Sequence, residues 1–144
     1  MNRKQRKIRQ FKAEYSAYLG YPDQLEELRE RLYELDCTMD IKSPNMSGIR
    51  YAPISRDERL ADFVTKREAL VKEIARVEKE QARIAHILEL MSSVERKNFE
   101  DVFKRVTTYR ALADGQYRSE KSLRRDVDRE ILHALTAVEG EYSL

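Results

Sequence analysis

Residues 56–91, RDERLADFVTKREALVKEIARVEKEQARIAHILELM, carry the pattern that decides the fold. Seam positions recur there at alternating steps of three and four, which is typical of a helix with a heptad repeat. These positions are Leu60, Phe63, Arg67, Leu70, Ile74, Val77, Gln81, Ile84, Leu88 and Met91. A helix over residues 56–92 would be about 50 Å long, which is more than a small compact domain can cover. We therefore expect its stripe to pack on other helices, on a second copy of the chain, or on both.

Arg67 and Gln81 are the polar residues in this seam. A buried polar side chain at such a position costs stability but fixes the register and the number of partners. Alternatively, both side chains lie at the edge of the seam and cover apolar surface with their stems. We favour the edge position.

Two further helices are expected over residues 3–19 and 22–40, joined to the long helix by a loop over residues 41–55. Their apolar stripes are Ile8, Phe11, Tyr15 and Tyr18 in the first, and Leu25, Leu28, Leu32, Leu35 and Met39 in the second. The loop, IKSPNMSGIRYAPIS, is rich in Pro and Gly, and Ser55 is expected to cap the helix after it, with Glu58 as its partner. Residues 1–92 are thus predicted to form a long antiparallel, coiled-coil-like helical stalk.

The composition agrees with an all-α protein. Charged residues make up 38% of the chain, whereas Gly and Pro are few and Trp is absent. No apolar run approaches the roughly 18 residues that a membrane span needs. The single Cys37 excludes an internal disulfide and fits a reducing compartment. We expect a protein without a membrane partner in the bacterial cytoplasm.

The net charge of +2 does not by itself indicate a nucleic-acid partner, so the distribution of charge must decide. A second domain is expected over residues 93–139, followed by a tail over 140–144. Its pattern predicts a helix capped by Ser93, then a short helix capped by Thr107 or Thr108. Gly115 is expected to end the short helix in the left-handed conformation, and Ser119 to cap the last helix. Two short helices, a Gly-containing turn and a longer cationic helix are typical of a helix-turn-helix.

The last helix combines apolar anchors with exposed cations. We expect Leu123, Val127, Ile131 and Leu135 to face inward, while Lys121, Arg124 and Arg125 project from its first half toward the bases and phosphates of double-stranded DNA. The predicted DNA-binding residues are Arg110, Arg118, Ser119, Lys121, Ser122, Arg124, Arg125 and Arg129. The alternative is a solvated, charged helix face in a bundle that binds only protein. The basic arm from Arg3 to Lys12 either adds backbone contacts or is a solvated face, and both interpretations stay open.

The segment TYRALADGQYRSEKSLRRDVDREILHAL, residues 108–135, resembles the fourth conserved region of bacterial sigma factors. Together with IKSPNMSG, the helix from Arg56 to Met91 and the ending RRDVDREILHAL, it is similar to the ArpU/RinA-like late-gene transcriptional regulators of phages and prophages. The resemblance implies promoter binding, a contact with bacterial RNA polymerase, and major-groove reading by Lys121, Arg124 and Arg125. A homodimer through the stalk would let paired readers use half-site spacing.

The sequence contains no motif that is typical of an enzyme's active site. His86 and His133 are far apart, Cys37 has no partner motif, and neither a phosphate-binding Gly-rich loop nor a nucleophile elbow occurs. We therefore expect no catalysis, no metal and no cofactor. The other functions considered are a coiled-coil interaction scaffold without DNA binding, and a small-terminase-like subunit that recognises DNA for packaging.

Overall fold

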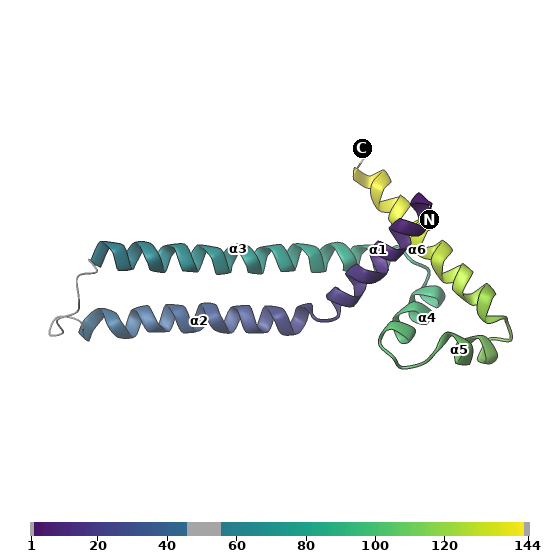
Figure 1. Ribbon diagram of the computed structural model, residues 1–144, viewed down its shortest axis with the longest axis horizontal. Helices are drawn as coiled ribbons and strands as arrows, with labels where there is room; N and C mark the ends of the chain where they lie inside the picture. The colour runs from purple at the N-terminus through teal and green to yellow at the C-terminus, as the bar shows by residue number, and fades with distance from the viewer. Residues whose placement is uncertain (1, 46–55, 143–144) are drawn as a thin grey trace. The chain divides into compact units, whose positions relative to one another are not determined.

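The computed structural model describes the backbone of residues 2–45 and 56–142, and the side chains of residues 2–38 and 56–141. All regular structure in this part of the chain is helical, which confirms the all-α prediction. The helices are α1 (Arg3–Tyr18), α2 (Tyr21–Asn45), α3 (Arg56–Glu89), α4 (Ser93–Phe103), α5 (Tyr109–Gly115) and α6 (Glu120–Tyr142) (Figure 1). None of these helices combines the length and the apolarity that crossing a bilayer requires.

The chain divides into two compact units, and α3 runs through both. Unit 1 consists of Met1–Leu19 with Ala82–Leu144, and unit 2 is Gly20–Gln81. This division differs from the one expected at residue 92, because α1 belongs with the C-terminal helices and not with the stalk. The apolar stripe of α1 was correctly identified, but its partners lie at the other end of the sequence.

Unit 2 is a pair of helices, α2 and the first part of α3, that lie side by side (Figure 1). Their core consists of buried Leu25, Leu28 and Val77, with half-buried Tyr21, Leu70 and Ile74 around it. Two ion pairs join the helices, Arg29–Glu78 at 3.2 Å and Asp36–Arg67 at 3.1 Å. The later residue of α2, Asp36, pairs with the earlier residue of α3, Arg67, so the two helices are antiparallel.

The seam predicted on α3 is buried only in part. Val77, Ile84, Leu88 and Met91 are buried, whereas Leu60 is 47% exposed. Arg67 is exposed and paired with Asp36, so its side chain lies at the edge of the seam, and Gln81 is half-buried. The edge position is therefore confirmed for Arg67.

Residues 41–45, expected to begin a loop over residues 41–55, are helical instead. α2 continues to Asn45, because the stretch from Ile41 to Ser43 contains no helix breaker and Pro44 stands in the last turn. Residues 46–55, with the expected cap at Ser55, lie outside the described residues.

The core of unit 1 is built around an aromatic cluster. Phe99 of α4 is fully buried, and its ring centroid lies 5.8 Å from that of Phe11, 4.8 Å from that of Tyr15 and 4.5 Å from that of Phe103. Phe11 and Tyr15 come from α1, so this cluster attaches α1 to α4. Burial raises the pKa of the Tyr15 phenol well above its usual range, which keeps the ring neutral.

Candidate nucleic-acid interface

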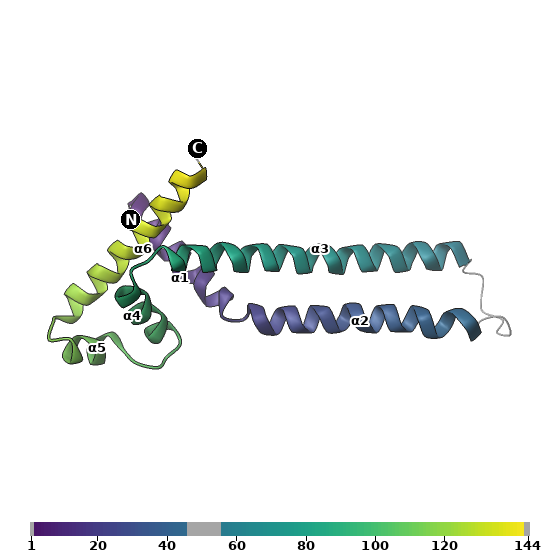
Figure 2. The ribbon, with the colours of Figure 1, turned by 180° about the vertical axis from the view of Figure 1, so that it is seen from behind.

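The three C-terminal helices of unit 1 form the candidate site. α5 and α6 are joined by a short turn, as both ribbon views show (Figure 2). Thr108, one of the two expected caps, accepts a hydrogen bond from the Ala111 backbone N–H at 3.1 Å. For α4 the N-cap is Ser92, one residue before the expected Ser93, and its side chain makes no capping bond.

Ser119 directly precedes α6 and caps it, as predicted. Its Oγ accepts a hydrogen bond from the Ser122 backbone N–H at 3.0 Å, and its carbonyl accepts one from the Leu123 N–H at the same distance. The hydroxyl of Ser119 therefore has a structural role at the helix start, and Ser122 contributes only its backbone N–H to this bond. The bond to the Ser119 hydroxyl satisfies one of the backbone N–H groups that have no partner within the helix at its N-terminus.

The turn between α5 and α6 differs from the expectation. Gly115 is the last residue of α5, and no described glycine has a positive φ. The left-handed residue is Tyr117, with φ 53°, and its side chain is 97% exposed. The N–H of Arg118 donates to the Ala113 carbonyl and that of Tyr117 donates to the Asp114 carbonyl, which is a Schellman motif. Tyr117 thus occupies the position that glycine normally fills.

α4 ends in the same motif. Arg105 has φ 61°, its N–H donates to the Val102 carbonyl, and the Val106 N–H donates to the Asp101 carbonyl. Both helix ends therefore place a bulky residue in a conformation that costs a side-chain-bearing residue about 1 kcal/mol. Such strain is most often retained at functional positions, which makes Tyr117 and Arg105 candidates that the sequence did not indicate.

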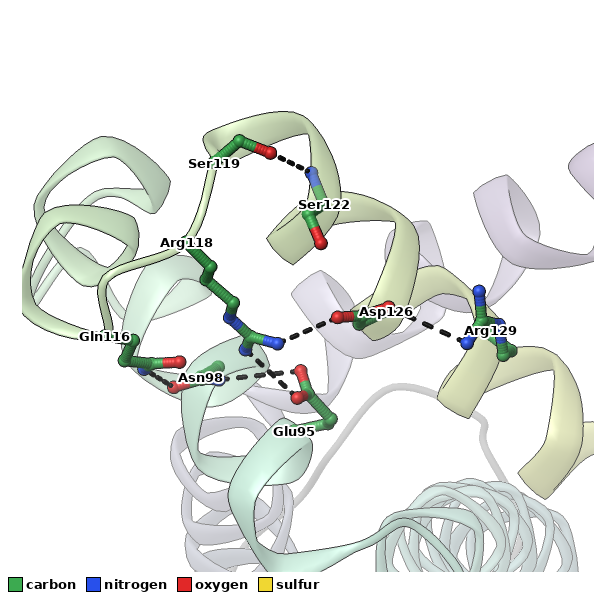
Figure 3. Close-up of polar contacts among 8 residues, drawn as sticks. All are labelled: Glu95, Asn98, Gln116, Arg118, Ser119, Ser122, Asp126 and Arg129. Carbon is green, nitrogen blue, oxygen red and sulfur yellow. Dashed lines mark hydrogen bonds and ion pairs between the residues drawn. The ribbon is translucent and has the colours of Figure 1, made fainter.

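Arg118 lies inside the site and does not project from it (Figure 3). Its Nη1 is 2.8 Å from Asp126 Oδ2 of α6, and its Nη2 is 3.1 Å from Glu95 Oε1 of α4. The three side chains are only 24%, 27% and 14% exposed. A neighbouring bond runs from Gln116 Nε2 to Oδ1 of the buried Asn98 at 2.9 Å. The geometry gives Arg118 an internal role that the sequence did not indicate, because its guanidinium joins the turn to α4 and α6; the phosphate contact expected for it stays a prediction.

The buried side of α6 agrees with the prediction. Leu123, Val127 and Ile131 are all 0% exposed, and Leu135 is half-buried. Because these residues recur at steps of four, the residues two positions away from each of them lie on the opposite side of the helix.

Three cations follow one another on that opposite side, Lys121, Arg125 and Arg129, and we call them the α6 cation row. All three are exposed. Arg129 lies 3.7 Å from Asp126 and its side chain stays 69% exposed, while Lys121 and Arg125 form no ion pair with any side chain that the structure describes. Their spacing of four residues places the outer two about 12 Å apart along the helix.

Arg124 lies on the flank of α6, beside the row. Its guanidinium carbon is 4.6 Å from the centre of the Tyr109 ring, and its Nη2 is 2.7 Å from Glu120 Oε1. Burial raises the pKa of the Tyr109 phenol, so the ring remains neutral and its face can attract the cation. Arg110 is exposed on α5. Of the eight predicted residues, the structure therefore gathers Lys121, Arg125 and Arg129 into one exposed row, while Arg118 and Arg124 are already engaged.

The described part of the chain brings together no group of three or more His, Cys, Asp or Glu side chains that could hold a metal ion. Comparison with protein-family models, with curated proteins and with solved structures found no significant match in any of the three. The interpretation of the site therefore depends on its geometry.

Proposed function

We propose that α5, the turn and α6 act as a helix-turn-helix that binds double-stranded DNA, and that the protein regulates transcription from the promoter it binds. The observation that supports this most directly is the contrast between the two sides of α6. One side is fully buried at Leu123, Val127 and Ile131, and the other carries the α6 cation row. A helix held in this way can enter a groove without leaving its own core.

The dimensions of a helix and the chemistry of the row suit the major groove. The groove is about 12 Å wide, which admits an α-helix of about 10–12 Å diameter with its side chains. Arg125 can donate two hydrogen bonds to the Hoogsteen edge of a guanine, while Lys121 can neutralise a phosphate near the start of the helix. Arg110 on α5 has the exposure that a second phosphate contact needs.

The internal ion pairs of Arg118 support the same proposal. A recognition helix must keep its position in the protein when it binds the negatively charged DNA. By joining the turn to both α4 and α6, Arg118 stabilises the start of α6, from which the cation row projects. A regulator of phage late genes that contacts bacterial RNA polymerase remains the proposal drawn from the sequence resemblance.

Selection of bound fragments from the source genome, followed by footprinting, tests the proposal. We expect a short protected site, bound more tightly than random DNA of equal length, and an affinity that falls as salt rises because phosphate contacts release counterions. Binding that strengthens at low salt without any preferred sequence would reduce the site to a general basic patch. No binding at any salt concentration would contradict the proposal.

A coiled-coil scaffold is the second candidate, and exposed apolar residues on unit 2 favour it. Tyr33, Leu60, Val64 and Val71 are large apolar side chains with exposures between 41% and 70%. Association through unit 2 is compatible with DNA binding by unit 1, so the two functions do not exclude each other.

A further inference from the structure

The exposed apolar side chains of unit 2 lie on one face of the helix pair. On α2, Tyr33 stands four residues after Arg29 and three before Asp36, and both of those residues reach across to α3. Steps of three and four place residues on the same side of a helix. Tyr33, 70% exposed, therefore lies on the same side as the two ion pairs.

Steps of three, four and seven residues place a second group of apolar side chains on one side of α3. Arg67 meets Asp36 there, and Leu60, Val64 and Val71 stand seven residues before it, three before it and four after it. All three residues are more than 40% exposed. We call this surface, made of Tyr33, Leu60, Val64, Val71 and the two ion pairs, the apolar face of unit 2. Every large hydrophobic side chain exposed in the described part of unit 2 belongs to it.

The charges on this face are complementary to themselves. Along α2 a cation, Arg29, is followed by an anion, Asp36, and beside them on α3 stand the anion Glu78 and the cation Arg67. A two-fold axis along the helices would place Arg29 over Glu78 of a second copy and Asp36 over its Arg67. A two-fold axis across the helices would place Arg29 over Asp36 of the second copy. Either arrangement pairs opposite charges, as an isologous interface requires.

We propose that a second copy of the chain packs against the apolar face of unit 2, so that two helix pairs form a four-helix bundle. Two helices alone cannot enclose their apolar stripes, whereas four can. In either arrangement Tyr33 and Val71, which stand between the two ion pairs along their helices, meet the other copy between the charges, while Leu60 and Val64 lie beyond the Asp36–Arg67 pair. The inference stands on unit 2 alone and does not depend on the DNA binding proposed for unit 1.

The first test is the mass of the full-length protein in solution over a concentration series. We expect twice the chain mass of 17.1 kDa for the wild type, and the single-chain mass for Val64→Glu combined with Val71→Glu. Both valines are exposed in the single chain, so the helical circular dichroism should not change. The matched control adds the same two charges away from the face, through Thr65→Glu with Ala69→Glu, and should remain a dimer. A monomeric wild type, a ring-sized assembly, or a dimer that survives the double valine variant would overturn the proposal.

The second test uses the charges. Arg29→Glu with Arg67→Glu makes the four charges of the face acidic, and Asp36→Lys with Glu78→Lys makes them basic. These charges also pair α2 with α3 within one chain, so each variant must first keep the helical circular dichroism of the wild type. We then expect each variant to be monomeric alone and the two to form a mixed dimer when combined, because opposite charges then meet. Homodimers that persist in both variants, or a mixture that stays monomeric while the wild type dimerises, would overturn the self-complementary arrangement.

Discussion

The guanidinium of Arg118 reaches the carboxylate of Asp126, with Nη1 2.8 Å from Oδ2, although Arg118 is one of the residues expected to contact DNA. The same guanidinium meets Glu95 of α4, so a single side chain joins three segments of unit 1. In sequence terms Arg118 is simply a cation before a cationic helix. In the folded protein it is a structural residue, and this distinction can be measured.

Replacing Arg118 by Ala should destabilise unit 1 by about 2 kcal/mol, because Glu95 and Asp126 would be left poorly solvated without their partner. Arg118→Lys should recover only part of this loss, since an ammonium group lacks the planar fork that meets two carboxylates. Urea denaturation followed by circular dichroism measures both variants. Arg110→Ala, at an exposed position on α5, is the control and should leave the stability unchanged. Full stability combined with lost DNA affinity in Arg118→Ala would instead support the phosphate contact.

Tyr117→Gly should stabilise unit 1 by about 0.5 kcal/mol, because glycine adopts the left-handed conformation without steric cost and loses part of that gain through its freedom in the unfolded chain. Arg105→Gly relieves the same conformation at the end of α4 and should gain a similar amount. Thermal unfolding measures both. If the exposed Tyr117 ring contacts DNA at the turn, Tyr117→Gly should weaken DNA binding, and an affinity equal to that of the wild type would argue against that contact.

Phe11→Ala should destabilise the C-terminal helices by about 3 kcal/mol, because its ring packs on Phe99 in the core of unit 1. Hydrogen exchange of the α6 amides gives a local measurement, and protection there should fall. Leu25→Ala removes a side chain from the core of unit 2 and serves as the comparison. Should α6 keep its protection in Phe11→Ala, α1 would belong with the stalk after all.

The sequence predicts which side of each helix is buried, because that follows from the helical period. It does not predict which helices pack against one another. Leu123, Val127 and Ile131 are buried as expected, because a helical period fixes which residues share a side. Ser119 and Thr108 act as caps because capping depends on residues three positions away. The apolar pattern that includes Phe11, by contrast, indicates that α1 buries one side. It does not indicate that this side packs on Phe99.

In the candidate site, too, local features could be predicted from the sequence and contacts between distant residues could not. Glu95 lies 23 positions before Arg118, so no local pattern connected the two residues. The left-handed residue was assigned to Gly115 because glycine adopts that conformation most easily, yet α5 runs to Gly115 and the hydrogen bonds of its end put Tyr117 there. Arg124 was expected to project, but its placement over Tyr109 depended on how α5 packs against α6.

His86 should make unit 1 weakly sensitive to pH. Its Nε2 lies 2.8 Å from Glu141 Oε2, and that carboxylate, followed by Glu89, raises the pKa of His86 above its ordinary value of 6.5. A raised pKa means that the stabilisation is complete below about pH 6.5 and is lost as the pH rises through the folded value. Wild type and His86→Gln should therefore differ most in urea midpoint at mildly acidic pH and converge at alkaline pH. A difference that grows toward alkaline pH would contradict this contact.

The most direct test of the central claim is the dissociation constant for the footprinted DNA site of Arg125→Ala, compared with Arg124→Ala and Lys72→Ala. Each variant removes one cation from an exposed position, but only Arg125 belongs to the α6 cation row, and Lys72 lies on α3. We expect Arg125→Ala to weaken binding about ten-fold or more, since a bidentate contact with a base is worth 1–3 kcal/mol. Arg124→Ala should lose less and Lys72→Ala should bind like the wild type. Equal affinities of Arg125→Ala and the wild type, at the same salt concentration and with intact helicity, would contradict the assignment of α6 as the DNA-reading helix.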